Sequence, residues 1–468
     1  MRRRVRSAVG SVSFLLVVTA CPAQPTTATL RPSPASLPIV PGAFDLIGHE
    51  PLLARGMNAG LAVHGGYAYV GSRIEGSAEH RGVLVVDVRD PANPAVVGAI
   101  GPPGKGALAE SSRELRIWPD EDLLIVLGFA RPTGPTVRFY DIGGKRSQDP
   151  ALISTYRPSL PPHEFYLWID PRRPERAVLY LSVAERFGDQ LLVTDISSAR
   201  EGRFRELATW HALFPDPGPN DALHSLSVSP AGTRAYLAYL TAGFFILDTS
   251  DVARSERHPR PRPVTPVVDR LQWDGWGAHS AIRLPGREIV LTTDEVYGSR
   301  ESGGGCPWGW VRLIDASDEA APLILSEYRA LPFNDKERCG QIDADTDRDA
   351  SFSSHDPTAT TNLAFVTWHS AGLHAITTDD PADPRPAAIF VPEPLDDVTM
   401  EDPLLSSGPQ KVVMWSYPII QDGLIYVVDL RNGLYVLSYR GPFEDEVSAI
   451  SFLEGNSNLG DALRLDER

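Results

Sequence analysis

The sequence predicts an all-β chain, a seven-bladed β-propeller of four-stranded blades whose ring is closed by a strand from the N-terminal side. Three observations support this fold. Apolar and polar residues alternate over short runs broken by Gly, Pro and Asp, which is the period of β-strands. A unit of two strands, followed in most copies by an Asp-containing turn, recurs seven times along the 468 residues. No amphipathic helix longer than two turns is evident in the sequence. Seven small sheets can form a stable all-β fold by closing into a ring, because the ring leaves few strand edges exposed.

The seven repeats follow one another through most of the chain. They lie at residues 66–100, 123–156, 177–198, 234–252, 288–328, 363–392 and 424–439. The seventh lacks the turn and the outer strand that follow in the others. The segment "AFDLIGHEPL" (43–52) has the composition of the missing strand. We therefore expect the N-terminal segment to complete the last blade and pair the two ends of the ring.

A strand-end aspartate recurs in five repeats. A carboxylate at this position typically accepts a hydrogen bond from the backbone two residues on, so we expect it to cap a turn rather than to act in catalysis. The residues are Asp87, Asp141, Asp195, Asp248 and Asp315.

The repeated core "VVDVRDPANPAVVG", with this aspartate and its "DPxxP" turn, resembles the LVIVD repeat of bacterial extracytoplasmic propellers. The resemblance runs from about residue 44 to residue 440, and we expect that range to form the propeller. It implies the architecture and a location outside the cytoplasm, but no particular activity. Residues 441–468 are expected to form a C-terminal tail.

The N-terminus has the features of a secretory signal. Residues 1–20 carry four arginines followed by an apolar run too short to span a membrane. The run ends in Val-Thr-Ala-Cys, which resembles the lipobox of bacterial lipoproteins. This resemblance implies lipidation of Cys21, a Pro/Thr-rich tether over 21–43 and a lipid anchor in the cell envelope, on the periplasmic side or at the cell surface. The alternative is an ordinary cleaved signal with an incidental cysteine.

Two further cysteines, Cys306 and Cys339, remain if Cys21 is lipidated. An even number in an oxidising compartment favours a disulfide between them, with two free thiols as the alternative. The formal net charge of −16 makes nucleic acid an unsuitable partner, because the chain would repel a phosphate backbone.

Four histidines fall at the starts of predicted first strands, which line the central channel of a propeller. His224, His279 and His355 begin blades 4, 5 and 6 in nearly the same register, and His163 begins blade 3 two residues earlier. Imidazole binds iron, copper and zinc, so the four predict one transition metal ion at one end of the channel.

Two other interpretations of these histidines stay open. They could be structural and hydrogen-bond within their own blades, or they could line a site for an organic ligand. The first function that we expect is a binding propeller with the metal site. The second is a metal-dependent oxidase or oxygenase, since the arrangement is similar to that of carotenoid-cleaving oxygenases, which hold iron with four histidines in a seven-bladed propeller. The third is a scaffold for an envelope protein, without a metal.

Neighbouring charged residues are expected to support the site rather than to bind the ion. Glu164 and Asp356 follow His163 and His355, and adjacent strand residues face opposite ways. Glu114 could reach the channel, but Arg113 beside it predicts an ion pair. His369 and His374 are not on first strands, so we expect them to be surface or packing residues.

Overall fold

The computed structural model describes residues 44–73, 82–101, 110–130, 134–183, 190–215, 218, 220–268, 270–273, 277–296, 307–330, 351–401 and 411–467. The chain divides into two compact units, 1–35 and 36–468, and all the described residues belong to the second. The predicted signal peptide and tether, and all three cysteines, lie outside the described residues.

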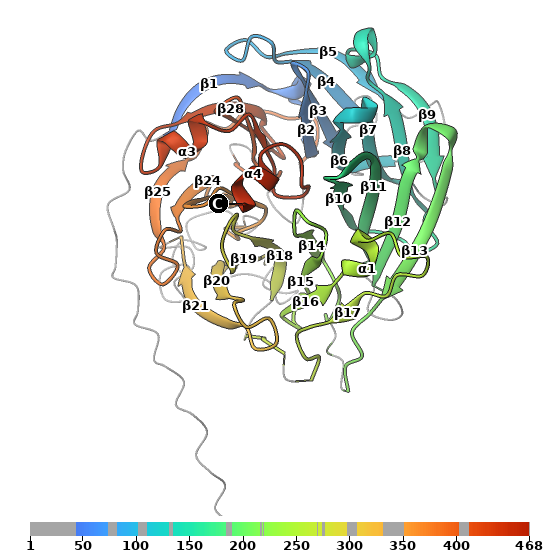
Figure 1. Cartoon of the computed structure of the whole chain (residues 1–468). Coiled ribbons are helices and arrows are strands. Elements are labelled where there is room, and N and C mark those ends of the chain that lie inside the picture. The colour runs from blue at the N-terminus through green and yellow to red at the C-terminus, as the bar shows by residue number, and fades with distance from the viewer. Residues whose placement is uncertain are drawn as a thin grey trace, which may run out of the picture. The chain divides into compact units, whose positions relative to one another are not determined.

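Seven antiparallel sheets follow one another around a ring, which confirms the predicted fold (Figure 1). Each sheet runs outward in chain order from its first strand. Blade 1 has β2 (Asn58–His64), β3 (Tyr67–Ser72), β4 (Val83–Asp87) and β5 (Ala95–Ile100). Blade 2 has β6 (Glu110–Trp118), β7 (Leu123–Ala130), β8 (Gly134–Asp141) and β9 (Ala151–Tyr156). Blade 3 has β10 (Glu164–Asp170), β11 (Arg173–Ser182), β12 (Leu191–Ser198) and β13 (Arg203–Trp210).

The next three blades repeat the order. Blade 4 has β14 (Ser225–Val228), β15 (Arg234–Ala238), β16 (Phe244–Asp248) and β17 (Arg262–Pro263). Blade 5 has β18 (Ala278–Arg283), β19 (Ile289–Asp294), β20 (Val311–Asp315) and β21 (Leu323–Tyr328). Blade 6 has β22 (Pro357–Ala359), β23 (Leu363–Thr367), β24 (Leu373–Thr377) and β25 (Arg385–Phe390).

Blade 7 is closed by both ends of the described chain. Its own strands are β26 (Ile419–Gln421), β27 (Leu424–Asp429) and β28 (Gly433–Tyr439). The outer strand is β1 (Phe44–Glu50), which pairs with β28 from Phe44 opposite Tyr439 to Glu50 opposite Leu434. The predicted N-terminal closure is therefore confirmed. On the channel side, β29 (Phe452–Leu453) adds a fifth strand beside β26.

The core lies between the blades. Seven of the buried apolar clusters each join two consecutive blades, and the one between blades 7 and 1 includes Val428 and Tyr426 on one side and Leu61 and Val63 on the other. Each sheet thus buries both faces, which explains why the second and third strands read as nearly continuous apolar runs.

The strand-end aspartates cap turns as predicted. In each case one carboxylate oxygen accepts a hydrogen bond from the backbone N–H two residues on, at 2.8–3.1 Å. The carboxylates are those of Asp87, Asp141, Asp195, Asp248 and Asp315. This role accounts for their recurrence without any part in chemistry.

The segment predicted to be a tail is folded against the ring. It carries α3 (Glu444–Ser448), β29 and α4 (Ala462–Asp466), and α4 lies over the centre of the ring in Figure 1. The Asn458 side chain accepts a hydrogen bond from Ile169 N–H at 2.8 Å and donates one to Ile169 C=O at 2.7 Å, in the first strand of blade 3. Asp466 pairs with Arg283 at the end of the first strand of blade 5. The C-terminal segment therefore covers the channel at the ends of the first strands.

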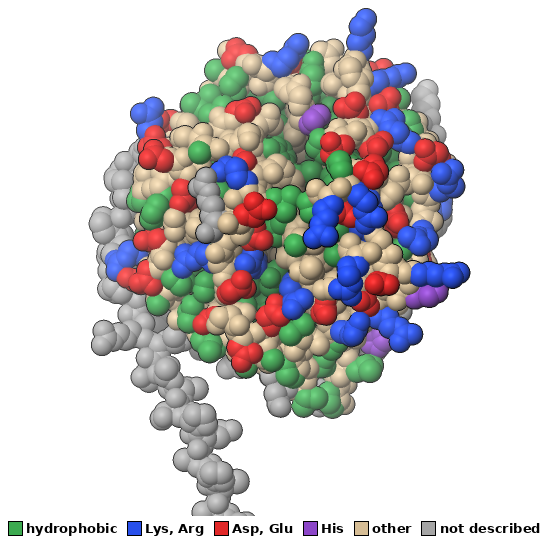
Figure 2. Space-filling model, in the orientation of Figure 1, with side chains coloured by type: hydrophobic (Ala, Val, Ile, Leu, Met, Phe, Trp, Pro, Cys, Tyr) green, Lys and Arg blue, Asp and Glu red, His purple; other side chains and the backbone are tan. Residues whose placement is uncertain are grey.

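Helices are few and short in the described part of the chain. Beside α3 and α4 there are α1 (Ser250–Ala253) and the 3-10 turns at Leu52–Ala54, Pro119–Glu121, Gly144–Ser147 and Ala199–Glu201. None of the described helices has the length and apolar character needed to span a bilayer. The face that carries the C-terminal segment shows acidic and basic side chains interspersed (Figure 2).

Candidate metal centre

The four predicted histidines occupy equivalent places in blades 3 to 6. The backbone N–H groups of His163, His224 and His355 donate to the last residues of the neighbouring second strands, at 2.7, 2.9 and 2.8 Å. His279 lies in β18, where a bulge separates Ala278 from Ser280. All four therefore stand where the first strand begins, at the end of the channel opposite the C-terminal segment.

The rings of these residues lie side by side. Ring centroids are 4.5 Å apart between His163 and His224, 4.1 Å between His224 and His279, and 4.4 Å between His279 and His355. We call these four residues the histidine row. The structure brings together every histidine that the first-strand pattern singled out.

In blades 3, 5 and 6, a hydroxyl group near the end of the second strand donates a hydrogen bond to a backbone carbonyl of the next blade. Ser182 donates to the His224 carbonyl at 2.6 Å, and Thr293 donates to the His355 carbonyl at 2.6 Å. Thr367 makes the same contact with the Trp415 carbonyl of blade 7, at 3.2 Å. These bonds fix the backbone that carries the row.

Two further residues, which the first-strand pattern did not indicate, lie beside the histidine row. Glu295 and His369 each stand two residues after one of these threonines, Thr293 in blade 5 and Thr367 in blade 6. The prediction for His369 was incomplete. The His369 side chain is fully buried, so it is not a surface residue. It also does more than pack, because its Nε2 lies 3.3 Å from Glu295 Oε1. His374, by contrast, is a packing residue, buried and in contact with Tyr328 Oη at 3.2 Å.

Three Nε2 atoms face the Glu295 carboxylate. His279 Nε2 lies 3.4 Å from Oε2, while the Nε2 atoms of His355 and His369 lie 3.7 and 3.3 Å from Oε1. We call Glu295, His279, His355 and His369 the Glu295 cluster. Its side chains are at most 6% exposed.

The opposite ring nitrogens of these histidines are engaged elsewhere. His355 Nδ1 lies 2.7 Å from the Trp415 carbonyl, His369 Nδ1 lies 2.8 Å from Ser351 Oγ, and His279 Nδ1 lies 2.9 Å from Ser280 Oγ. Such contacts hold an imidazole in one orientation and select its tautomer. The Nε2 atoms are thereby directed at the carboxylate.

Some atoms of this site are buried without a hydrogen-bond partner. They are Glu295 Oε1, His369 Nε2 and His224 Nδ1. Glu295 Oε1 and His369 Nε2 are close to each other, but their contact does not have the geometry of a hydrogen bond. Buried polar atoms are nearly always paired, so each such atom requires an explanation. A cation bound between them would satisfy both the nitrogen and the oxygen lone pairs.

The protonation states suit a cation. Burial lowers the pKa of His224 to about 4 and that of His355 to about 3, and it holds the pKa of His163 and His279 well below the usual range. Burial opposes ionisation of Glu295, but its contact with His369 and the charge of neighbouring imidazoles outweigh burial and lower its pKa to about 2. At pH 7 the row is neutral and Glu295 is an anion, the forms that bind a metal.

Glu164 and Asp356 lie on the Nδ1 side of the row. Glu164 Oε1 is 3.7 Å from His224 Nδ1, and Asp356 is 3.3 Å from His355 Nδ1 and 3.9 Å from His279 Nδ1. Burial, together with the charges of nearby carboxylates, raises the pKa of Glu164 to about 8 and that of Asp356 well above its usual range. Glu164 therefore holds a proton at neutral pH, and burial disfavours the ionised form of Asp356, which fits a supporting place rather than that of an anionic ligand.

Glu114 forms the expected ion pair, but with a different arginine. Its carboxylate lies 2.8 Å from Arg116 Nη2, and the charges of Arg116 and Arg113 both oppose the rise that burial causes in its pKa. The reason for this partner is the bulge in β6 between Ser112 and Glu114, which gives Arg113 an extra position in the strand.

The described residues form four overlapping groups of potential metal ligands. Within each group, one ligand atom of each residue lies within 4.8 Å of those of the other members. The groups are His163 with Glu164 and His224; His224 with His279 and Glu295; His279 with His355 and Asp356; and Glu295 with His355 and His369. The predicted lipidation of Cys21 and the predicted Cys306–Cys339 disulfide fall outside the described residues.

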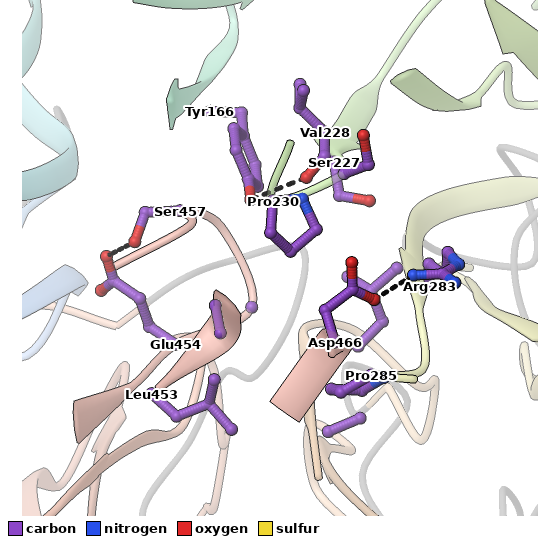
Figure 3. A pocket seen from close by; sticks show the side chains of 15 residues that line it. Tyr166, Ser227, Val228, Pro230, Arg283, Pro285, Leu453, Glu454, Ser457 and Asp466 are labelled. Atoms are coloured by element: carbon purple, nitrogen blue, oxygen red, sulfur yellow. Dashed lines mark hydrogen bonds and ion pairs between the residues drawn. The ribbon is translucent and has the colours of Figure 1, made fainter. Parts of the chain in front are cut away.

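A cavity lies at the other end of the channel, beneath the C-terminal segment (Figure 3). Its volume is about 60 Å³, with Tyr166, Arg283, Glu454 and Asp466 among its lining residues. Figure 3 shows the Arg283–Asp466 ion pair beside it. This space holds a few water molecules rather than a larger ligand. The candidate site is therefore the histidine end.

No known family matches the chain, and no curated protein matches it. Solved structures that are similar include the β-propeller domain of Cps50 (Swd1) from Myceliophteria thermophila, with 11% identity, a TM-score of 0.44, and 82% of this chain and 96% of that chain covered. A protein from Lactobacillus plantarum has 14% identity, a TM-score of 0.48 and coverage of 75% and 88%. Sqt1 from Chaetomium thermophilum, bound to the N-terminus of the ribosomal protein L10, has 13% identity, a TM-score of 0.47 and coverage of 85% and 90%.

Proposed function

We propose that this propeller is an extracytoplasmic, lipid-anchored protein that binds one transition metal ion, iron, copper or zinc, at the Glu295 cluster. The observation that carries the proposal is the convergence of three Nε2 atoms on one buried carboxylate, at 3.3–3.7 Å, with each Nδ1 engaged elsewhere. Three imidazole nitrogens and one carboxylate oxygen are a common donor set for these metals.

The energetics of the cluster favour the same interpretation. A buried carboxylate usually requires a cation or full hydrogen bonding, and the imidazoles of His279 and His355 are neutral at pH 7. Purely structural histidines would be expected to satisfy both ring nitrogens, as His374 does through Tyr328 and the Ala371 carbonyl. His369 Nε2 and Glu295 Oε1 do not.

The proposed ligand set differs in part from the four histidines of the row. His279 and His355 belong both to the four histidines predicted from the sequence and to the ligand set proposed here. His224 lies within 4.8 Å of the ligand atoms of His279 and Glu295, and is an additional donor. His163 is grouped with Glu164 and His224 and belongs to the wall of the site.

Elemental mass spectrometry of the full-length chain, purified from detergent-solubilised membranes, tests the proposal. We expect about one iron, copper or zinc per chain, retained in His374→Asn and lost from Glu295→Gln and His369→Asn. His374 is the matched control because it too is a buried histidine of blade 6. Circular dichroism checks that each variant is folded.

A second measurement does not depend on variants. Metal added to the chelator-treated wild type should raise its melting temperature, because a ligand that binds only the folded state stabilises it. Absence of stoichiometric metal after reconstitution, with no thermal shift, would overturn the proposal. The anchor is tested separately: Cys21→Ala should move the protein from the membrane fraction to the soluble periplasmic fraction, and an unchanged distribution would contradict lipidation.

A further inference from the structure

The two carboxylate oxygens of Glu295 face different histidines. Oε1 lies 3.3 Å from His369 Nε2 and 3.7 Å from His355 Nε2, whereas Oε2 lies 3.4 Å from His279 Nε2. The carboxylate therefore separates the two histidines of blade 6 from the histidine of blade 5. This division indicates that each oxygen has its own set of nitrogen donors.

The potential ligands around Glu295 form two groups that share only this residue. One group is Glu295 with His355 and His369, and the other is Glu295 with His224 and His279. Among the described residues, no group of potential ligands joins His369 to His279 or to His224. Each group thus offers two imidazoles and one carboxylate oxygen, and Glu295 has the place of a bridge between them.

The fold explains this placement of Glu295. The residue directly follows the second strand of blade 5, β19, and its blade lies between blades 4 and 6 in the ring. Within each group the two imidazoles are neighbours, with ring centroids 4.1 Å apart for His224 and His279, and 5.1 Å apart for His355 and His369. Blades 4 and 5 therefore supply one pair of nitrogen donors, and blade 6 supplies the other.

Two neighbouring metal ions suit such an arrangement. A carboxylate can bind one ion through each of its oxygens, and two-metal sites in proteins hold their ions about 3.5–4 Å apart. Imidazole and carboxylate are both ligands for iron, copper and zinc, so the two groups select the same kinds of metal. The donors around Glu295 are therefore enough for a pair of ions that share one carboxylate.

The two groups differ in their access to solvent. The side chains of His355 and His369 are 3% and 0% exposed, whereas that of His224 is 13% exposed. The unpaired buried atoms Glu295 Oε1 and His369 Nε2 both belong to the blade 6 group. An ion in that group satisfies both atoms, while an ion beside His224 exchanges more readily. We therefore expect the first ion to survive purification and the second to be lost more easily.

We propose that the site takes a second transition metal ion, held by His224, His279 and Glu295 Oε2, and that Glu295 bridges it to a first ion at His355, His369 and Oε1. The inference rests on the proposed metal function, which requires only one ion. With both ions bound, His279 belongs to the second, because its Nε2 faces Oε2. Each ion then has three protein donors, and the remaining coordination position is available to water or to a substrate.

Titration of the chelator-treated, full-length protein with cobalt(II) provides the test. The visible spectrum counts the bound ions, and electron paramagnetic resonance reports whether they interact. We expect about two cobalt ions per chain at saturation, the second bound about tenfold or more weakly than the first. The resonance signal per cobalt should fall when the second ion binds, because the spins of bridged ions couple. These measurements use the wild type, so they do not depend on the folding of any variant.

Variants then locate the second ion. His224→Asn should bind only the first cobalt ion, with unchanged affinity and without the fall in the resonance signal. Glu295→Gln should lose both ions, because the carboxylate belongs to both groups. His374→Asn alters a buried histidine of blade 6 that belongs to neither group, so it is the matched control and should bind both ions. Circular dichroism checks that each variant is folded.

The outcomes separate the two proposals. A wild-type chain that binds no cobalt overturns both the metal function and this inference. Saturation at one ion, or two ions without spin coupling, overturns the bridged second site alone. Loss of the second ion from folded His163→Asn would place that ion in the group of His163, Glu164 and His224 instead, and would also overturn the bridge.

Discussion

Glu295 Oε1 lies 3.3 Å from His369 Nε2, and neither atom has a hydrogen-bond partner although both are buried. The two residues follow second strands of neighbouring blades, so the contact joins blade 5 to blade 6 at the channel end. A shared cation explains both atoms at once.

The first prediction concerns Glu295 with and without metal. In chelator-treated protein, Glu295→Gln should melt below wild type, because the lowered pKa of Glu295 means that its ionised form stabilises the folded chain at neutral pH. The metal-dependent rise in melting temperature should disappear in the variant. Thermal melts with and without the reconstituting metal, followed by circular dichroism, measure both effects. A metal-dependent rise that persists in the folded variant would show that the carboxylate is structural and not a ligand.

The second prediction is a fall in the stability of the metal-free protein as the pH drops from about 6.5 to about 4. The pKa of His224 is about 4 and that of His355 about 3 in the folded state, against about 6.5 in an unfolded chain. The unfolded chain therefore takes up more protons in this range. The stability that these neutral histidines contribute is present above pH 6.5 and is lost as the pH falls.

Glu164 acts in the opposite sense. With its pKa raised to about 8, it contributes stability at low pH that is lost as the pH rises toward 8. Glu114 and Asp429, whose pKa values are also raised, act in the same sense as Glu164, whereas the lowered pKa of Glu295 adds to the effect of the histidines, so we expect the loss on acidification to prevail. Urea unfolding at several pH values measures the slope, which His355→Asn should reduce by about 1.4 kcal/mol per pH unit at most. The exposed His258→Asn is the control, and an equal slope in wild type and His355→Asn would contradict the assignment.

The third prediction concerns ring closure. Gly48 in β1 comes so close to blade 1 that an added Cβ would lie 2.1 Å from the Pro91 carbonyl oxygen. Gly48→Ala should therefore destabilise the fold by about 1–3 kcal/mol. Leu46→Ala alters an exposed residue of the same strand, 54% exposed, and should have little effect. Urea unfolding compares the two, and equal midpoints would mean that β1 does not lock the ring.

The fold could be predicted from the sequence because local signals repeat in every blade. The alternation of apolar residues marks the strands, and carboxylates such as that of Asp195 mark the turns through a bond to the backbone two residues on. The closing strand could be predicted from the missing outer strand of the last repeat. These features depend on short stretches of chain, which a sequence displays directly.

The site could be predicted only in part. His279 and His355 were found because first strands line the channel, but Glu295 and His369 stand beyond the ends of second strands. A signal for them exists, since each follows a Thr-x pair, Thr293-Asp294 and Thr367-Trp368. This signal can be interpreted only when it is known that the threonines contact the next blade. Thr293 Oγ1, for example, donates to the His355 carbonyl at 2.6 Å. Pairing between blades cannot be derived from the period of a single strand.

The folding of the C-terminal segment was also missed, because few of its residues follow a strand or helix period. Its attachment depends on single polar side chains, of which Asn458 is the clearest. That side chain bonds both the N–H and the C=O of Ile169, at 2.8 and 2.7 Å, and also reaches the Pro230 carbonyl at 3.2 Å. Asn458→Ala would leave the N–H and C=O of Ile169 without this partner, whereas the Pro230 carbonyl would keep its hydrogen bond from the Trp168 indole at 3.0 Å.

The fourth prediction follows from those bonds. Asn458→Ala should lower the free energy of unfolding by about 2–3 kcal/mol, since each buried group left unpaired costs about 1–3 kcal/mol. Asn93→Ala, which removes an exposed contact with Asp90, should change it by less than about 0.5 kcal/mol. Urea unfolding measures both. The metal content should be the same in the two variants, because Asn458 bonds Ile169 near the end of β10, whereas His163 of the histidine row precedes the beginning of this strand. Loss of metal from folded Asn458→Ala would instead show that the segment holds the channel in the shape that the cluster needs.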